Sequence, residues 1–208
     1  MIYTDKLVEI QDGLALYVPD PELVKTTYEQ LFAKDKNTPF PFWAQVWPAA
    51  KALSSFLKTE PQLIAGKKVF ELGAGIGLPS FSMTVHASEM IISDHAPEAV
   101  SLIEKNIQFL GLKNVKAMNL DWNHFSDNIR AEIILLSDIN YAPDQFVPLL
   151  ALIRKCIGQG STIILSTPQR ITVTPFAEAL QPFIKHSVLQ TIEHKKQTAD
   201  IGILIFSK

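Results

Sequence analysis

Three glycines at alternate positions, Gly73, Gly75 and Gly77, follow a short β-type run that extends from Lys67 to Leu72. This order predicts a strand, a tight turn and the start of a helix. Glycine adopts positive φ without strain and lets a ligand lie against the backbone, while the N-terminus of the next helix offers unpaired N–H groups and a partial positive charge. The turn is therefore suited to a nucleotide-like ligand.

The spacing of these glycines discriminates between ligand classes. A dinucleotide-binding turn has Gly-x-Gly-x-x-Gly, which would require a glycine where this chain has Leu78. Glu71, two residues before the first glycine, places a carboxylate at the strand end, and an acid there suits a cationic ligand. A purely structural Gly-rich turn in another α/β protein is the alternative that this motif alone leaves open.

The run from Glu71 to Gly77, Glu-x-Gly-x-Gly-x-Gly, resembles the first motif of class I S-adenosylmethionine-dependent methyltransferases. The ligand of these enzymes carries a sulfonium and an ammonium group and no phosphate, which agrees with an acid at the strand end. The resemblance implies S-adenosylmethionine as the cofactor, with Glu71 and the glycine backbone facing its methionine moiety.

Two further acids follow predicted strands. Asp94 ends the run 91–94, about 20 residues after the glycine turn, which is the interval expected for a ribose-binding acid. Because a helix is predicted from Pro97, Asp94 is also a candidate helix cap. Asp121 and Trp122 follow the next strand and could contact adenine, although a loop acid beside a surface anchor is the simpler interpretation of that pair alone. Ligands of open α/β sheets bind beyond the carboxyl ends of the strands, so acids at three successive strand ends favour one shared site.

Helical and strand patterns alternate along the rest of the chain, which predicts an α/β fold with a mostly parallel sheet between helices. Helices are predicted over residues 21–32, 46–57, 97–110 and 144–157. Further strands are predicted over residues 115–120, 132–137, 162–166, 186–192 and 201–206. Ahead of them, Asp12-Gly13 between two apolar runs predicts a β-hairpin over residues 2–18.

Composition and missing motifs exclude several classes of partner and chemistry. The net charge of −2 provides no basic field for nucleic acid, and no apolar run approaches the ~18 residues of a membrane span. We therefore expect a cytoplasmic protein that binds neither nucleic acid nor a membrane. A single cysteine, Cys156, fits a reducing compartment and is expected to be buried in a helix. The five histidines form no ligand pair, so no metal is expected, and hydrolase or ATPase motifs are missing.

The fourth strand of the predicted nucleotide-binding sheet, residues 133–137, is followed by Asp-Ile-Asn-Tyr at residues 138–141. With Phe-Trp-Ala-Gln-Val-Trp-Pro at residues 42–48 and the motifs above, the chain from about Pro39 onward is similar to the seven-strand protein-lysine methyltransferases of methyltransferase family 16. Residues 42–48 and Ser-Thr-Pro-Gln-Arg at 166–170 resemble the branch that methylates the β-subunit of electron transfer flavoprotein. That branch often has Gly-Asp-Pro-Gly-Arg at the latter place.

This resemblance implies a Rossmann-like, seven-stranded, mostly parallel sheet with helices on both faces and an antiparallel last strand. Residues 39–208 would form the S-adenosylmethionine-binding domain, with residues 1–38 as a hairpin and helix extension packed on it. Asp138 and Tyr141 would line the methyl-acceptor pocket as catalytic residues. Trp47 would lie over the cofactor, although a core anchor is an equal alternative. The implied cofactor-binding residues are Trp47, Glu71, Gly73, Gly75, Gly77, Asp94, Asp121 and Trp122.

Methyl transfer from a sulfonium to an amine requires chiefly alignment of the two groups. A lysine, with a reference pKa of ~10.4, must first lose a proton to water or a nearby base. Asp138 could accept a hydrogen bond from this amine, and Tyr141 could shape its channel. We therefore predict an N-methyltransferase that acts on a lysine of a protein. The alternatives are a small-molecule amine methyltransferase of the same fold and a non-catalytic nucleoside-binding module.

Overall fold

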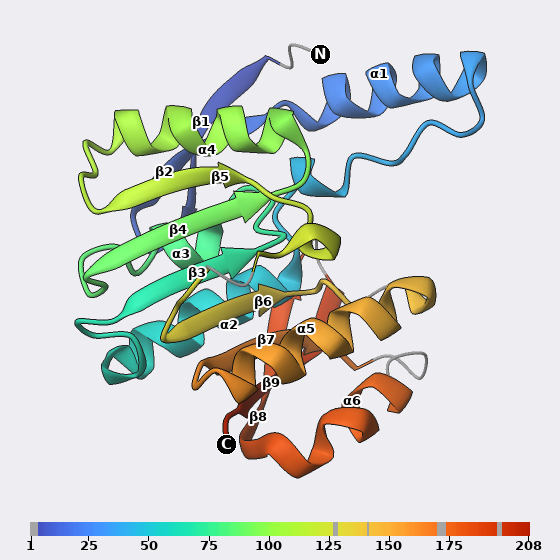
Figure 1. Cartoon of the computed structure of the whole chain (residues 1–208). Helices are drawn as coiled ribbons and strands as arrows, with labels where there is room; N and C mark the ends of the chain where they lie inside the picture. Colours follow the sequence, from blue (N-terminus) through green and yellow to red (C-terminus); the bar gives the residue numbers. More distant parts are fainter. Residues whose placement is uncertain (1–3, 127–128, 141, 170–173, 195–196) are drawn as a thin grey trace.

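The structure is a computed structural model that describes residues 4–126, 129–140, 142–169, 174–194 and 197–208. It contains a seven-stranded sheet with the strand order β5-β4-β3-β6-β7-β9-β8 and a separate two-stranded hairpin (Figure 1). The strands of the large sheet are β3 (Lys68–Leu72), β4 (Glu89–Asp94), β5 (Val115–Asn119), β6 (Ile133–Ser137), β7 (Thr162–Pro168), β8 (Ile184–His194) and β9 (Gln197–Phe206). Strands β3 to β7 are parallel, whereas the last strand, β9, is antiparallel to both β7 and β8. The predicted seven-stranded sheet with an antiparallel last strand is confirmed.

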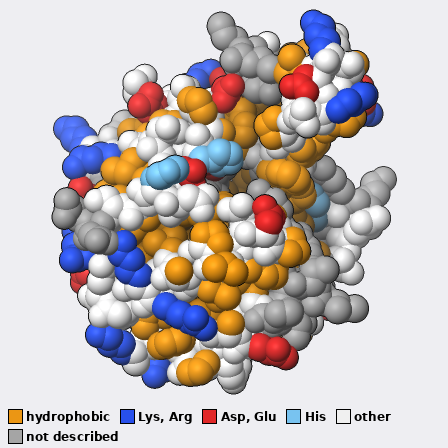
Figure 2. Space-filling view, turned by 45° about the vertical axis from the view of Figure 1, so that its right-hand side comes forward, with side chains coloured by type: hydrophobic (Ala, Val, Ile, Leu, Met, Phe, Trp, Pro, Cys, Tyr) orange, Lys and Arg blue, Asp and Glu red, His pale blue; other side chains and the backbone are white. Residues whose placement is uncertain are grey.

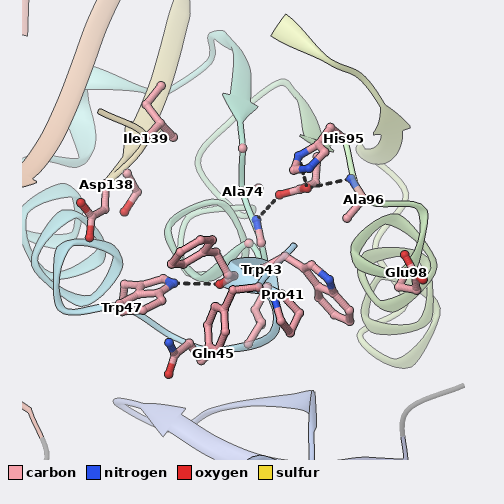
Figure 3. A pocket seen from close by; sticks show the side chains of 18 of the residues that line it. Pro41, Trp43, Gln45, Trp47, Ala74, His95, Ala96, Glu98, Asp138 and Ile139 are labelled. Atoms are coloured by element: carbon pink, nitrogen blue, oxygen red, sulfur yellow. Dashed lines mark hydrogen bonds and ion pairs between the residues drawn. The ribbon is translucent and has the colours of Figure 1, made fainter. Parts of the chain in front are cut away.

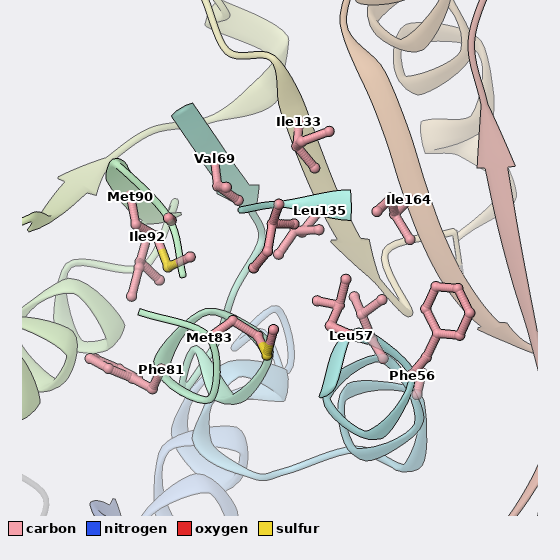
Figure 4. Packing of buried hydrophobic residues seen from close by; sticks show 14 of the residues in the cluster. Phe56, Leu57, Val69, Phe81, Met83, Met90, Ile92, Ile133, Leu135 and Ile164 are labelled. Carbon is pink, nitrogen blue, oxygen red and sulfur yellow. The ribbon is translucent and has the colours of Figure 1, made fainter. Parts of the chain in front are cut away.

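Helices cover both faces of this sheet because successive side chains of the central strands alternate between two apolar clusters. Val69 of β3 and Ile133 of β6 belong to one cluster, and their neighbours Phe70 and Ile134 belong to the other. The first cluster packs against α2, α3 and α4 and is shown in Figure 4, and the second packs against α5 and α6. These helices are α2 (Pro48–Thr59), α3 (Leu78–Phe81), α4 (Pro97–Phe109), α5 (Phe146–Gly158) and α6 (Thr174–Leu180). Central strands that are buried on both faces explain the continuous apolar runs of the sequence.

The N-terminal hairpin and the helix that follows it precede the main sheet. Strands β1 (Asp5–Gln11) and β2 (Leu14–Pro19) pair antiparallel, as the sequence predicts. The hairpin is joined to α4, because the backbone N–H of Tyr17 donates to Asn106 Oδ1 at 2.7 Å and Asn106 Nδ2 donates back to the Tyr17 carbonyl at 3.0 Å. Helix α1 (Pro21–Lys34) then extends away from the body of the molecule (Figure 1).

Several element boundaries differ from the prediction: among the strands, β8 covers residues 184–194 where 186–192 is predicted, and β9 begins at Gln197 where residue 201 is predicted. Val46 lies ahead of its helix, since α2 begins at Pro48, whose fixed φ and missing N–H suit the first helical position. The helix predicted from Asp144 is preceded by a 3-10 turn over Pro143–Gln145 and becomes α-helical only at Phe146. Strand β7 continues to Pro168, so the segment 166–170, which was expected to follow this strand, lies partly within it. Its Arg170 falls outside the described residues.

The cysteine, the lengths of the helices and the potential metal ligands were also subjects of prediction. Cys156 lies buried in α5, as predicted, and burial raises the pKa of its thiol to about 11, so it is not a reactive thiolate. Across the described ranges, no helix is both long and apolar enough to span a bilayer. No group of three potential metal ligands occurs in that same part of the chain.

The order of the strands identifies the place where a ligand is expected. After β3 the chain adds β4 and β5 on one side, and β6 and β7 then pair on the other side of β3. In open α/β sheets, the crevice at such a reversal, beyond the carboxyl ends of the strands, is where ligands bind.

Candidate active site

A cavity of about 700 Å³ lies at this point. Its walls come from the glycine turn after β3, the segments after β4 and β6, α1, and residues 38–47 ahead of α2. Trp47 and Asp138 lie on one side of the cavity, and His95, Ala96 and Glu98 on the other (Figure 3). The surface view shows hydrophobic side chains in the hollow beneath the projecting helix (Figure 2). A concave site of this size, lined by apolar groups and a few polar ones, is typical of small-molecule sites.

The glycine turn forms the floor of the cavity and requires its glycines. Gly73, Gly75 and Gly77 have φ values of +60°, +56° and +79°, which side-chain-bearing residues rarely adopt. A Cβ at Gly73 would lie 3.1 Å from the Trp122 ring, and one at Gly75 would lie 3.1 Å from the Trp43 carbonyl oxygen. The turn is therefore a bare backbone cradle, which a side chain would partly fill.

Asp94 lines the cavity and holds the turn in place. Its Oδ2 accepts a hydrogen bond from Gly75 N at 2.8 Å, and its Oδ1 accepts one from Ala96 N at 3.0 Å, just before α4. His95 Nδ1 lies 3.3 Å from Oδ1, and this interaction raises the pKa of His95. Asp94 thus lines the cavity and binds the backbone just ahead of α4, but the N-cap of this helix is Ala96 and no side chain caps it, so the predicted helix-cap role is wrong. Its contact with ribose stays a prediction.

Glu71 is fully buried and is not among the residues that line the cavity. Its Oε2 accepts a hydrogen bond from Ser80 N at 3.1 Å, in α3, while Oε1 is buried without a hydrogen-bond partner in the described structure. Burial raises the pKa of this carboxyl to about 7, and the negative charge of Asp94 adds to the effect. The carboxylate lies behind the turn and contacts the helix that follows it.

Asp121 and Trp122 have different environments: Trp122 lines the cavity and Asp121 does not. Trp122 lines the cavity against Gly73, and its indole N–H donates to Gln145 Oε1 at 3.3 Å. Asp121 does not line the cavity; its Oδ1 accepts from Asn123 N at 2.9 Å, and this hydrogen bond lowers the pKa of the Asp121 carboxyl. Asp121 therefore has the contacts of a turn-capping acid.

Asp138 and Trp47 face the cavity from the ends of two different elements. Asp138 follows β6, is 8% exposed, and has a φ of +52°, which is uncommon for a residue with a side chain. Its backbone N–H donates to the Ser166 carbonyl of β7 at 2.9 Å. The Trp47 indole N–H donates to the Phe42 carbonyl at 2.8 Å. Tyr141, the other predicted catalytic residue, lies outside the described residues.

Sequence reasoning missed the aromatic residues that extend the cavity toward α1. Tyr28, Phe40, Phe42 and Trp43 all line it. A cluster of aromatic residues between 40 and 47 was the available signal, but the contribution of α1 arises from contacts that periodicity does not predict. These aromatic side chains add apolar groups to the cavity lining that the cofactor motifs do not predict.

The cavity has an acidic charge balance. Among the described residues that line it, Asp94, Glu98 and Asp138 are acidic, His95 is titratable, and neither lysine nor arginine occurs. Carboxylates without competing cations favour positively charged ligands. A phosphate-bearing dinucleotide finds no cationic partner in this lining.

The family model described as lysine methyltransferase matches residues 30–187, which is more than half of the chain. This chain belongs to the lysine methyltransferase family. S-adenosylmethionine is the cofactor of the family, and both the glycine cradle and the acidic lining fit its sulfonium and ammonium groups.

Curated relatives have different named substrates. The calmodulin-lysine N-methyltransferase of Arabidopsis thaliana is 31% identical over 67% of this chain and 47% of its own length. The human histone-arginine methyltransferase METTL23 is 32% identical over 52% of this chain and 60% of its own. The electron transfer flavoprotein beta subunit lysine methyltransferase of Xenopus laevis is 27% identical over 71% and 61%. The matched part of the chain spans about half to three fifths of the length of these relatives.

Solved structures show the same fold at lower sequence identity. The N-methyltransferase NodS from Bradyrhizobium japonicum, in complex with S-adenosyl-L-homocysteine, has a TM-score of 0.63 at 13% identity and covers 88% of this chain and 99% of its own. Magnesium protoporphyrin IX methyltransferase from Synechocystis, also with the bound product nucleoside, has a TM-score of 0.57 at 15% identity and covers 76% and 82%. Together they support the methyltransferase fold of this chain.

Proposed function

We propose that this protein is an S-adenosylmethionine-dependent N-methyltransferase that acts on a lysine side chain of a protein. The observation that carries the proposal is the shared cavity: Asp138, after β6, faces the same acidic space as the glycine turn after β3. A donor held at the turn and an amine held at Asp138 would therefore meet in one place.

The chain's own residues divide the binding of the donor among them. The backbone at Gly73 and Gly75 would hold the methionine portion, Asp94 the ribose hydroxyls, and Trp122 the adenine face. Glu71 would act from behind the turn through Ser80 N, and Asp121 through the turn that carries Trp122. When bound, S-adenosylmethionine supplies an electrophilic methyl group on a positively charged sulfur.

The protein must then supply a neutral, aligned amine. An acceptor lysine enters as an ammonium and must release a proton to water or a nearby base before its nitrogen can attack. The bond from nitrogen to the methyl carbon would form as the methyl–sulfur bond breaks, with S-adenosylhomocysteine as the leaving group. The Asp138 carboxylate can accept a hydrogen bond from this group and orient it, and Trp47 closes the same side of the cavity. The acidic lining attracts the cation, and the apolar walls favour its neutral form.

Calorimetry tests the cofactor half of this proposal. Titration with S-adenosylmethionine, S-adenosylhomocysteine and NAD should show saturable binding of the two sulfur nucleosides and none of NAD. Binding of NAD alone, or no binding of the sulfur nucleosides, would contradict the cofactor assignment.

Transfer of tritiated methyl groups tests the acceptor half. The candidates are calmodulin, histones and the electron transfer flavoprotein beta subunit, because relatives are named for these substrates, together with free amines as controls. We expect label on a protein, located on lysine by mass spectrometry. Label on free amines only would favour the small-molecule alternative, and label on arginine would correct the acceptor residue. Saturable cofactor binding without transfer to any acceptor, including the proteins of a cell lysate, would favour a nucleoside-binding module.

A further inference from the structure

The cavity has more lining residues than those that the sequence motifs assign to the cofactor. Its second lobe is lined by Tyr28 and Leu31 of α1 and by the segment from Thr38 to Phe42. None of these residues belongs to the glycine turn or to the ends of β3 and β4, where the cofactor is expected. These residues are therefore available to bind a group other than the nucleoside.

Four aromatic rings form a continuous track along this lobe. Ring centroids are 5.1 Å apart between Tyr28 and Phe40, 4.9 Å between Phe40 and Phe42, and 6.1 Å between Phe42 and Trp47. The track therefore runs from α1 to Trp47, which lies on the Asp138 side of the cavity (Figure 3). It leads to the place where the acceptor amine is expected.

The middle of this track remains open to solvent. Phe40 is 41% exposed and Phe42 is 43% exposed. Two adjacent, half-exposed aromatic rings at the mouth of a cavity leave apolar area that a partner can remove from water, and such area drives association. Phe109, on α4, is 45% exposed but lies outside the cavity lining and packs edge-on against Tyr17. Phe40 and Phe42 are therefore distinguished from Phe109 by their position in the cavity lining, and not by their exposure.

The segment that carries the track is held in a defined conformation. Phe42 N donates to the Phe40 carbonyl at 2.9 Å, and Thr38 Oγ1 donates to the Asp35 carbonyl at 2.8 Å. Pro39 and Pro41 restrict the backbone on either side of Phe40. A surface that is ordered before binding loses less conformational entropy when a partner docks.

We propose that the aromatic track is the docking site for the acceptor protein, and that it binds a bulky apolar side chain close to the target lysine. This inference rests on the proposed function, because it assumes that the lysine enters at Asp138. The acidic cavity takes the cationic lysine, and the uncharged track takes its apolar neighbour, so the two parts of the pocket match two different side chains of one segment.

The test compares a double variant, Phe40→Ser with Phe42→Ser, with the matched control Phe109→Ser, which removes an equally exposed ring outside the cavity. Each protein is titrated with S-adenosylmethionine and then supplied with tritiated S-adenosylmethionine and a lysate from cells that lack this chain. We expect the double variant to bind the cofactor within about twofold of the unaltered protein and to label lysate protein at least tenfold more slowly, which corresponds to about 1.4 kcal/mol. The control should label at the unaltered rate.

Other outcomes would overturn the inference. An unchanged labelling rate in the double variant would remove the docking role, and a parallel loss of cofactor affinity would assign the rings to the cofactor site. An unaltered protein that binds cofactor but labels nothing would refute the proposed function itself, which the variants do not affect. If the double variant melts at a lower temperature, Phe40→Leu with Phe42→Leu keeps the apolar bulk and should restore most of the rate. Failure of the leucine pair, in a folded protein, would also contradict apolar docking.

Discussion

The two sides of the cavity are built in opposite ways. On the cofactor side, buried carboxylates hold backbone: Asp94, 3% exposed, binds Gly75 N and Ala96 N, and Glu71, fully buried, binds Ser80 N. On the proposed acceptor side, the rings of Phe40 and Phe42 are half-exposed to solvent. Asp138 lines the cavity there and has an uncommon, positive φ. The proposed cofactor side is thus part of the folded core, whereas on the proposed acceptor side Asp138 is buried and the rings of Phe40 and Phe42 lie at the surface.

This difference has a consequence for mutagenesis. Changes on the cofactor side should alter stability together with affinity, because the same hydrogen bonds serve both. Changes on the acceptor side should alter turnover while the fold and the cofactor affinity persist. A residue that does not follow the pattern of its side would show that the two sides are coupled.

The largest effect is expected for Asp138→Asn. Asparagine keeps the size of the side chain and tolerates the φ of +52°, which alanine would adopt only with strain, but it removes the negative charge. Loss of the carboxylate that binds and orients the acceptor amine should lower kcat about 1000-fold, because alignment of the two groups supplies most of the rate enhancement. Cofactor affinity should stay within about twofold by calorimetry, since no cofactor contact is lost. Equal losses of turnover and cofactor affinity would move Asp138 to the cofactor side.

The next effect concerns stability on the cofactor side. The folded-state pKa of Glu71 is raised to about 7 from 4.5, so the folded state favours the protonated acid. Its contribution to stability is complete below pH 4.5 and is lost as the pH rises through 7. Because one pKa unit is about 1.4 kcal/mol, ionisation of Glu71 should cost about 3 kcal/mol at pH 8.

Glu71→Gln removes this ionisation while keeping an acceptor for Ser80 N. Urea unfolding measures the difference in the free energy of unfolding between Glu71→Gln and the unaltered protein. Between pH 4.5 and pH 8 this difference should change by about 3 kcal/mol in favour of the variant. Glu104→Gln, which makes the same substitution at an exposed position on α4, is the matched control. A pH-independent difference for Glu71→Gln would mean that another group carries the effect.

The glycine turn and the position of Asp94 beside it could be predicted from sequence because their determinants are local, whereas Glu71 and Asp121 do not line the cavity. A glycine turn after an apolar strand and an acid at the end of the next strand are short motifs, and alternating apolar patterns yield the order of strands and helices. The burial of Glu71 was not predictable in this way, since it depends on the position of Ser80 after the turn. The proposed acceptor side was the least predictable, because Tyr28 and Phe40 meet only when the chain after α1 returns beside this helix.

The smallest effect separates backbone strain from cavity shape. Gly75 and Gly111 have similar φ values, +56° and +64°. A Cβ added at Gly75 would lie 3.1 Å from the Trp43 carbonyl oxygen, whereas a Cβ added at Gly111 would have no neighbouring atom within 4 Å. Alanine at either position should cost about 1 kcal/mol of stability from strain. Only Gly75→Ala should also weaken S-adenosylmethionine binding, by about tenfold, because it narrows the cradle and shifts the N–H that Asp94 accepts. Calorimetry on both variants measures this directly. If Gly111→Ala weakens binding equally, the loss follows from strain in the fold, and the cofactor side would owe its affinity to overall stability instead of to the shape of the turn.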